Sequence, residues 1–144
     1  RLFEVTGVQT CALPISGASG GCQAEIGSGS GMAAAAICYI RGGSLEQLGH
    51  ACAMALKNLM GLVCDPVGGL VEVPCVKRNV GGAVNALAAA DMALAGIESQ
   101  IPVDQVIDAM KEVGDKMDVS LKETGFGGVA ATPRAEEVVK RLGM

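Results

Sequence analysis

Glycine and proline divide this sequence into apolar, alanine-rich segments of about the length of a helix. The chain has 144 residues, of which 50% are hydrophobic, only 2% are aromatic and 21 are glycine. A sheet-rich core would need more aromatic and β-branched side chains, whereas small side chains allow helices with thin apolar faces to pack closely. The sequence therefore predicts a single all-α domain of closely packed, small-residue helices.

Glycine-rich turns separate four predicted helices and a short tail helix. Ser44 and Gln47 have the spacing of a capping box, which marks the start of the second helix. Residues 61–74 contain several glycines and prolines and are predicted to be irregular, apart from a short extended piece over 70–73. The predicted helices cover residues 24–40, 45–59, 79–94, a stretch after Pro102 with Val106, Ile107, Met110 and Val113 on its apolar face, and 135–142.

The first residues differ from the rest of the chain. Residues 1–14 (RLFEVTGVQTCALP) show no helical periodicity and are similar to translated adapter read-through. We therefore expect a non-native leader over residues 1–15, which includes Cys11, followed by a helical portion over 16–144. The alternative is an ordinary strand over residues 3–8 from a domain that is cut off upstream.

Three of the six cysteines stand beside glycine or proline, where we expect loops rather than helix interiors: Cys22, Cys64 and Cys75. The helices over 24–40 and 45–59 are predicted to form an antiparallel hairpin, which returns the chain to the pole where it started. The irregular segment after Cys64 can then fold back and bring Cys75 to the same pole. Three thiolates at one pole suit a metal centre, and three ligands rather than four leave a coordination position open.

Other interpretations of the cysteines stay open on the residues alone. A structural zinc site needs four ligands, and His50 would have to be the fourth, although its place along a helix favours an exposed or capping role. A disulfide is disfavoured because no secretory signal is visible, so that we expect a reducing, cytoplasmic compartment. Iron–sulfur clusters are held by cysteine thiolates. Cys38 and Cys52 lie in apolar helical stretches and are predicted to be small buried hydrophobic residues.

Charge and hydropathy exclude two classes of partner. The net charge is −4 and no basic stripe is present, so a nucleic-acid surface is not expected. The longest apolar run, residues 32–40, is far shorter than the roughly 20 residues that cross a bilayer. Lys77, Arg78 and Asn79 form a local polar cluster after Cys75, which we interpret as a solvated helix start in preference to a site for a small anion.

Four runs of sequence carry a family resemblance. They are SGASGGCQAE (16–25), LKNLMGLVCDPV (56–67), VEVPCVKRN (71–79) and GGVAATP (127–133). Together they resemble the catalytic α chain of the iron–sulfur-dependent L-serine dehydratase (L-serine ammonia-lyase) of the two-subunit bacterial form. Three cysteine-centred motifs in the same order make this resemblance specific.

The resemblance implies an enzyme that uses a 4Fe–4S cluster held by Cys22, Cys64 and Cys75. One iron would have no protein ligand and would act as a Lewis acid on the hydroxyl group of L-serine, giving pyruvate and ammonia without pyridoxal phosphate. Ser16 and Gly17 would hold the substrate carboxylate or shape a turn, and Asp65 would accept from the substrate ammonium or cap its loop. A serine dehydratase β chain is the implied partner. The resemblance identifies no general base, and the segment can hold the cluster ligands while being inactive alone.

Overall fold

Residues 16–143 are described by the computed structural model, and they form six α-helices and no strand. The predicted all-α class is confirmed. The predicted leader over residues 1–15, with Cys11, lies outside the described residues. The helices are α2 (Gly17–Gly20), α3 (Ser28–Ile40), α4 (Leu45–Asn58), α5 (Cys75–Leu94), α6 (Val103–Lys116) and α7 (Pro133–Leu142).

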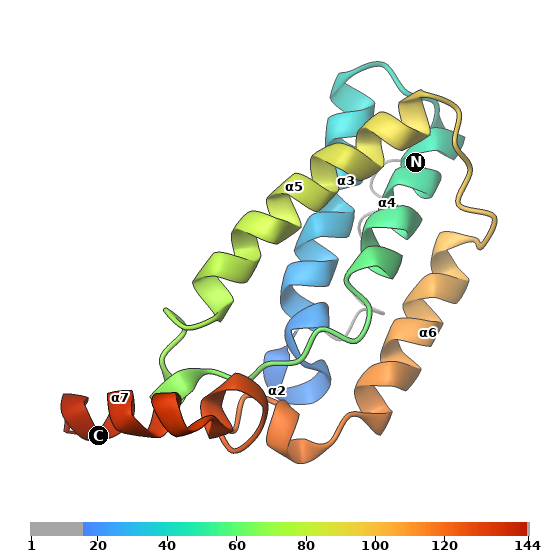
Figure 1. The fold of residues 1–144 in the computed structure, drawn as a ribbon. Helices are drawn as coiled ribbons and strands as arrows, with labels where there is room; N and C mark the ends of the chain where they lie inside the picture. The colour runs from blue at the N-terminus through green and yellow to red at the C-terminus, as the bar shows by residue number, and fades with distance from the viewer. Residues whose placement is uncertain (1–15, 144) are drawn as a thin grey trace.

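Three helices form the centre of the molecule. α3, α4 and α5 all pack against one another, and α6 packs on α4 at the side away from α5 (Figure 1). The short α2 contacts α6, and α7 lies across the lower end, where it contacts the two 3₁₀ turns Val67–Gly69 and Gly128–Ala131. The start of α3, the end of α4 and the start of α5 therefore meet at one pole, as the hairpin prediction required.

Small side chains allow the three central helices to approach closely. A methyl group added at Gly31 would lie 3.0 Å from Cγ of Leu56 in α4. One added at Gly82 would lie 2.7 Å from Cγ2 of Ile26, and the Ser30 hydroxyl donates to the Gly82 carbonyl at 2.8 Å. The buried core around these contacts is mostly alanine, filled out by a few larger side chains, among them Leu48, Leu56 and Met110.

The predicted capping box at the start of α4 is confirmed. The Ser44 hydroxyl accepts from the backbone N–H of Gln47 at 3.2 Å, and the Gln47 side chain accepts from the Ser44 N–H at 2.9 Å. The same Gln47 side chain donates to the Ala93 carbonyl at 2.9 Å. One residue thus starts α4 and also fixes the far end of α5 against it.

Several helix boundaries differ from the prediction. α5 begins at Cys75 rather than at residue 79, because Pro74 can precede a helix whose first N–H groups need no partner within it. The extended piece predicted over residues 70–73 is wrong, since this segment folds into turns closed by the Val76 N–H to Val71 carbonyl bond of 2.9 Å. The first predicted helix starts with a π-helical turn, Gln23–Gly27, and then continues as α3.

The last two helices are close to their predictions. In α6 the predicted face of Val106, Ile107 and Met110 is buried, but Gly114 takes the next buried position while Val113 stays partly exposed. The tail helix begins at Pro133, two residues before its predicted start, because the Thr132 hydroxyl caps it by accepting from the Ala135 N–H at 3.3 Å.

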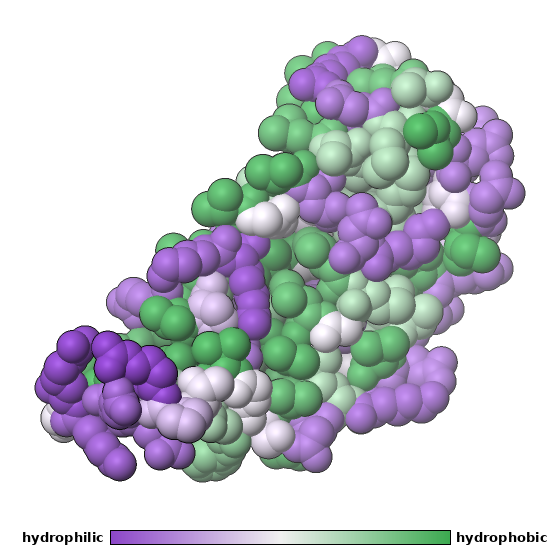
Figure 2. All heavy atoms as spheres, viewed as in Figure 1, coloured by the Kyte–Doolittle hydropathy of each residue, from purple (hydrophilic) through white to green (hydrophobic). Residues whose placement is uncertain are grey.

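The visible surface divides by polarity. Figure 2 shows hydrophilic side chains over α7 and along α6, and hydrophobic ones along the upper part of the edge formed by α5. Among residues 16–143, no helix combines the length and the apolar character needed to span a membrane.

Two neighbouring glycines of α5 provide a test of the close packing. We expect Gly82→Ala to destabilise the chain, since the new methyl group would collide with the buried Ile26 side chain. Gly81→Ala meets nothing within 4 Å and should stabilise the helix by about 0.5–1 kcal/mol. Urea unfolding of both variants measures the difference. Equal shifts in the two variants would show that α5 does not pack closely on the start of α3.

Candidate metal centre

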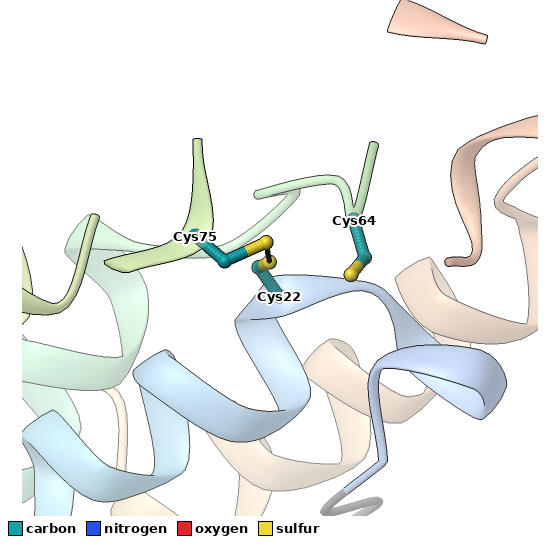
Figure 3. Close-up of side chains that lie close together, drawn as sticks. All are labelled: Cys22, Cys64 and Cys75. Carbon is teal, nitrogen blue, oxygen red and sulfur yellow. Dashed lines mark hydrogen bonds between the residues drawn. The ribbon is translucent and has the colours of Figure 1, made fainter. Parts of the chain in front are cut away.

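The three predicted cysteines converge at the pole where the central helices meet. Cys22 directly precedes the π-helical turn, Cys64 lies in the loop after α4, and Cys75 is the first residue of α5. Their side chains point toward one another (Figure 3), with the sulfurs of Cys22 and Cys75 separated by 3.8 Å. All three sulfurs lie within 4.8 Å of one another, so they can hold a metal ion together.

The three cysteines are buried, and the apolar side chains of Ile26, Leu59 and Leu62 pack around them. No disulfide joins the three sulfurs. An all-sulfur donor set suits soft metals such as iron in iron–sulfur clusters, or zinc.

The backbone on either side of Cys22 is fixed by a glycine and a hydrogen bond. Gly21 has a φ of 75°, and a side chain there would meet Met117 Sδ at 2.7 Å, so the position requires glycine. The next N–H, that of Gln23, donates to the Leu62 carbonyl at 2.8 Å. This bond joins the Cys22 segment to the loop that carries Cys64.

A short parallel bridge fixes Cys64. Its N–H donates to the Leu121 carbonyl and its carbonyl accepts from the Glu123 N–H, each at 2.8 Å. The residues of this bridge lie far from Cys64 in the sequence, after α6. The loop is therefore held by two backbone hydrogen bonds that no local motif indicates.

Arg78 and Asp65 form an ion pair beside the sulfurs. Arg78 Nη1 lies 2.6 Å from Asp65 Oδ1, donates to the Val63 carbonyl at 2.7 Å and lies 4.0 Å from Cys22 Sγ. Asp65 is almost completely buried, whereas the Arg78 side chain is 21% exposed. The pair connects α5 to the Cys64 loop and places a positive charge near the thiol groups.

Asp65 also joins a third segment to the site. Its Oδ2 accepts from the Val129 N–H at 2.6 Å. Gly128 makes this approach possible, since it has a φ of 60° and a side chain there would collide with the Asp65 carboxylate. Asp65 thus holds a distant segment by a hydrogen bond and Arg78 by an ion pair, and neither contact is a cap of its own loop.

Burial determines how the thiols ionise. Burial raises the pKa of the Cys64 thiol, and the neighbouring Cys22 and Cys75 raise it further. Burial likewise raises the pKa of Cys22, although hydrogen bonds with Cys64 and Arg78 act in the opposite direction. For Arg78, burial disfavours the charge, but Asp65 and Cys22 outweigh it and raise the pKa. Without a bound metal, the two thiols are thus held in the protonated form.

Of the other predicted positions, Gly17 lies beside the cysteine sulfurs and His50 lies outside the cysteine group. Gly17 lies against Cys64, since a methyl group added there would be 3.2 Å from Sγ, and its N–H donates to Glu25 Oε1 at 3.2 Å. The Ser16 carbonyl accepts from the N–H of Ser19 and closes the first turn of α2. His50 is outside the cysteine group, and its Nδ1 accepts from the Ser99 N–H at 3.2 Å.

The prediction was right for Cys38 and Cys52 but missed the role of Arg78. Cys38 and Cys52 are buried in the helical core, as predicted. Arg78 was predicted to be part of a solvated helix start, and its place beside Cys22 was missed. The only signal in the sequence was its position one helical turn after Cys75.

Comparison with known proteins shows which family the chain resembles. The family described as serine dehydratase alpha chain matches residues 4–130. The chain belongs to this family. The family membership predicted from the cysteine-centred motifs is therefore confirmed.

Individual relatives in the family are closely similar. The "Probable L-serine dehydratase, alpha chain" of Bacillus subtilis (strain 168) is 65% identical over 128 residues, which are 89% of this chain and 43% of that protein. The protein of the same name from Latilactobacillus sakei is 64% identical over 119 residues, 83% of this chain and 57% of the relative. The "L-serine dehydratase, alpha chain" of Peptoniphilus asaccharolyticus is 52% identical over 122 residues, 85% and 42% respectively. The chain spans about half the length of these relatives.

The ion pair beside the sulfurs can be compared with an exposed one. We expect Arg78→Gln to cost about 2–3 kcal/mol of stability, because it leaves the buried Asp65 carboxylate without its charge partner. Arg41→Gln removes the partner of Asp91 in an exposed pair and should cost at most about 1 kcal/mol. Urea unfolding measures both changes. A loss in Arg78→Gln no larger than in Arg41→Gln would contradict the role given to the pair.

The raised thiol pKa values predict a loss of stability in alkali. In the unfolded chain cysteine ionises near a pH of about 8.5, whereas Cys22 and Cys64 resist ionisation in the folded chain. Their contribution is thus fully present below that pH and is lost as the pH rises above it. Urea unfolding at about pH 8 and about pH 10 measures the loss, which should be smaller in the Cys22→Ala, Cys64→Ala double variant. An equal loss in both chains would contradict this assignment.

Proposed function

We propose that this chain is part of an L-serine ammonia-lyase, which converts L-serine to pyruvate and ammonia without pyridoxal phosphate. The observation that carries the proposal is the convergence of three buried cysteine sulfurs within 4.8 Å in a chain of the serine dehydratase α-chain family. The names of the relatives supply the substrate: they are L-serine dehydratases.

The cofactor that we propose is a 4Fe–4S cluster held by Cys22, Cys64 and Cys75. The site fits such a group, since its donors are three buried thiols, apolar side chains pack around them, the Arg78 guanidinium lies nearby and no disulfide joins the sulfurs. Three protein ligands leave one iron without a cysteine. When bound, the cluster would supply a Lewis acid for the serine hydroxyl, which is a poor leaving group.

The residues of this chain have distinct proposed tasks. Cys22, Cys64 and Cys75 bind the cluster as thiolates, and the nearby Arg78 guanidinium partly balances their negative charge. The Arg78–Asp65 pair keeps the Cys64 loop aligned with the start of α5.

We propose that the substrate binds on the side of Cys64 where Gly17 lies. Gly17 lies against the Cys64 sulfur, since a methyl group added there would be 3.2 Å from Sγ, and the carboxyl groups of Glu25 and Glu123 lie beside the same position. Ser16 and Gly17 are proposed to contact the substrate carboxylate, and the neighbouring acids are suitably charged for its ammonium group.

The whole enzyme needs more than this chain. The α-chain names of the relatives imply a separate β chain, and about half of each relative lies beyond the matched region. We propose that residues 16–144 are the cluster-binding helical portion of a cytoplasmic two-chain enzyme, and that the portion alone can hold the cluster without full activity.

Anaerobic reconstitution with iron and sulfide tests the cofactor. We expect a brown protein with broad visible absorbance, which is lost in Cys22→Ser, Cys64→Ser and Cys75→Ser but kept in the control Cys38→Ala, whose sulfur lies in the helical core. Mössbauer spectra should contain one iron whose signal changes when L-serine is added. This change would establish the cofactor and the substrate together.

The contrary result is equally specific. Tight zinc binding by the three cysteines, with no colour that depends on sulfide, would show that the chain is a zinc-stabilised helical module and not part of an iron–sulfur enzyme. Unchanged metal content and thermal stability in all three serine variants would instead leave a purely structural bundle.

A further inference from the structure

The outer face of α5 is apolar and exposed along most of its length. Four large aliphatic side chains, spaced so that they share one side of the helix, are each at least 45% exposed: Val76, Val80, Val84 and Leu87. Between residues 79 and 90 the helix has no charged residue at all. Figure 2 shows hydrophobic side chains along the upper part of the edge formed by α5 and hydrophilic ones near the start of the helix. A helix that is apolar on both its inner and its outer side is normally covered on both.

The other long peripheral helix shows what a water-facing side looks like in this chain. The exposed side of α6 carries alternating acids and lysines, with ion pairs from Lys111 to Asp115 and from Lys116 to Glu112. On α5, one ion pair joins two exposed side chains, Arg41 with Asp91 just beyond Leu87, and the partly buried Arg78–Asp65 pair lies at the other end of the helix. The charge-free surface therefore has a defined edge and does not reflect a general lack of surface charge.

The α5 face is continuous with the metal centre. Val76 directly follows the ligand Cys75, and Val80 lies one further turn along the same side. Beside this stripe, toward α3, lies a hollow lined by Ile26, by the small residues Gly29, Ser30, Ala33, Gly82 and Ala83, and at its polar side by Glu25 and Asn79. Side chains of a covering segment can enter this hollow, and the same segment would pass close to the cysteines.

We propose that this face is where the part of the family's α chain that this chain does not span packs on the cluster-binding portion. About half of each relative's α chain lies beyond the matched region, so an additional layer of comparable size exists in those proteins. Permanent interfaces are apolar and resemble a protein core cut in half, whereas interfaces between partners that associate transiently are more polar. The occupant is thus a segment with aliphatic side chains at helical spacing from the same α chain, and it completes the wall beside Cys75.

Paired lysine substitutions test the proposal in two chains. Val80→Lys with Val84→Lys should move the melting temperature of the 144-residue chain by no more than about 2 °C, because both side chains are already exposed. The same change at the aligned residues of the full-length Bacillus subtilis α chain should lower it by at least about 8 °C. Asp108→Lys, on the exposed side of α6, is the control and should shift neither chain.

A labelling experiment covers the case in which the longer variant fails to fold. Val84→Cys and the control Asp108→Cys are reacted with a maleimide, and the label at each position is measured by peptide mass mapping. Both should react at similar rates in the 144-residue chain. In the full-length Bacillus subtilis α chain only the position aligned with Val84 should slow, by on the order of tenfold or more.

Three results would overturn the proposal. Equal labelling at both positions in the full-length α chain would leave the face uncovered. Protection that needs the β chain would assign the face to that partner, and protection of the 144-residue chain that rises with its concentration would assign it to a second copy. None of these readings involves iron or serine, so they are independent of the proposed activity.

Discussion

The structure depends on the close contact of α3 with its two neighbours. Gly31 faces Leu56 of α4, and Ser30 donates to the carbonyl of Gly82 in α5. A larger side chain at either glycine would push the helices apart. Because the three helices lie so close, the residue before the π-helical turn that leads into α3, the loop after α4 and the first residue of α5 all reach the same small volume. The cysteines occupy these three positions, so the convergence of their sulfurs is a direct consequence of helix packing.

A second layer of contacts determines the detailed geometry of that volume. The Arg78–Asp65 pair, the Asp65 bond to the Val129 N–H and the bridge between Cys64 and Lys122 attach three separate segments to one loop. Buried charges are stable only when they are paired and hydrogen-bonded. Arg78 fulfils this requirement for Asp65 and at the same time lies close enough to Cys22 to influence its sulfur. Structural support and electrostatic tuning are therefore provided by the same side chain.

Prediction succeeded where the signal was local. The Ser44–Gln47 capping box, the apolar face around Val106 and the burial of Cys38 each follow from residues within a few turns of one another, and all are confirmed. It failed at the start of α5, which was predicted at residue 79, whereas the helix begins at Cys75, directly after Pro74. It also missed Arg78, whose partner Asp65 lies on a different element. A polar residue at a helix start has the same sequence pattern whether it faces water or a buried carboxylate.

The sequence by itself determined the all-α class, the hairpin and the family, because small-residue periodicity, caps and cysteine-centred motifs are written into short runs of residues. Only the tertiary structure decided that three sulfurs lie within 4.8 Å, that a parallel bridge after α6 holds Cys64, and that the outer face of α5 is bare. These features arise from contacts between residues far apart in the chain. Their formation depends on how closely whole helices pack, which no single stretch of sequence specifies.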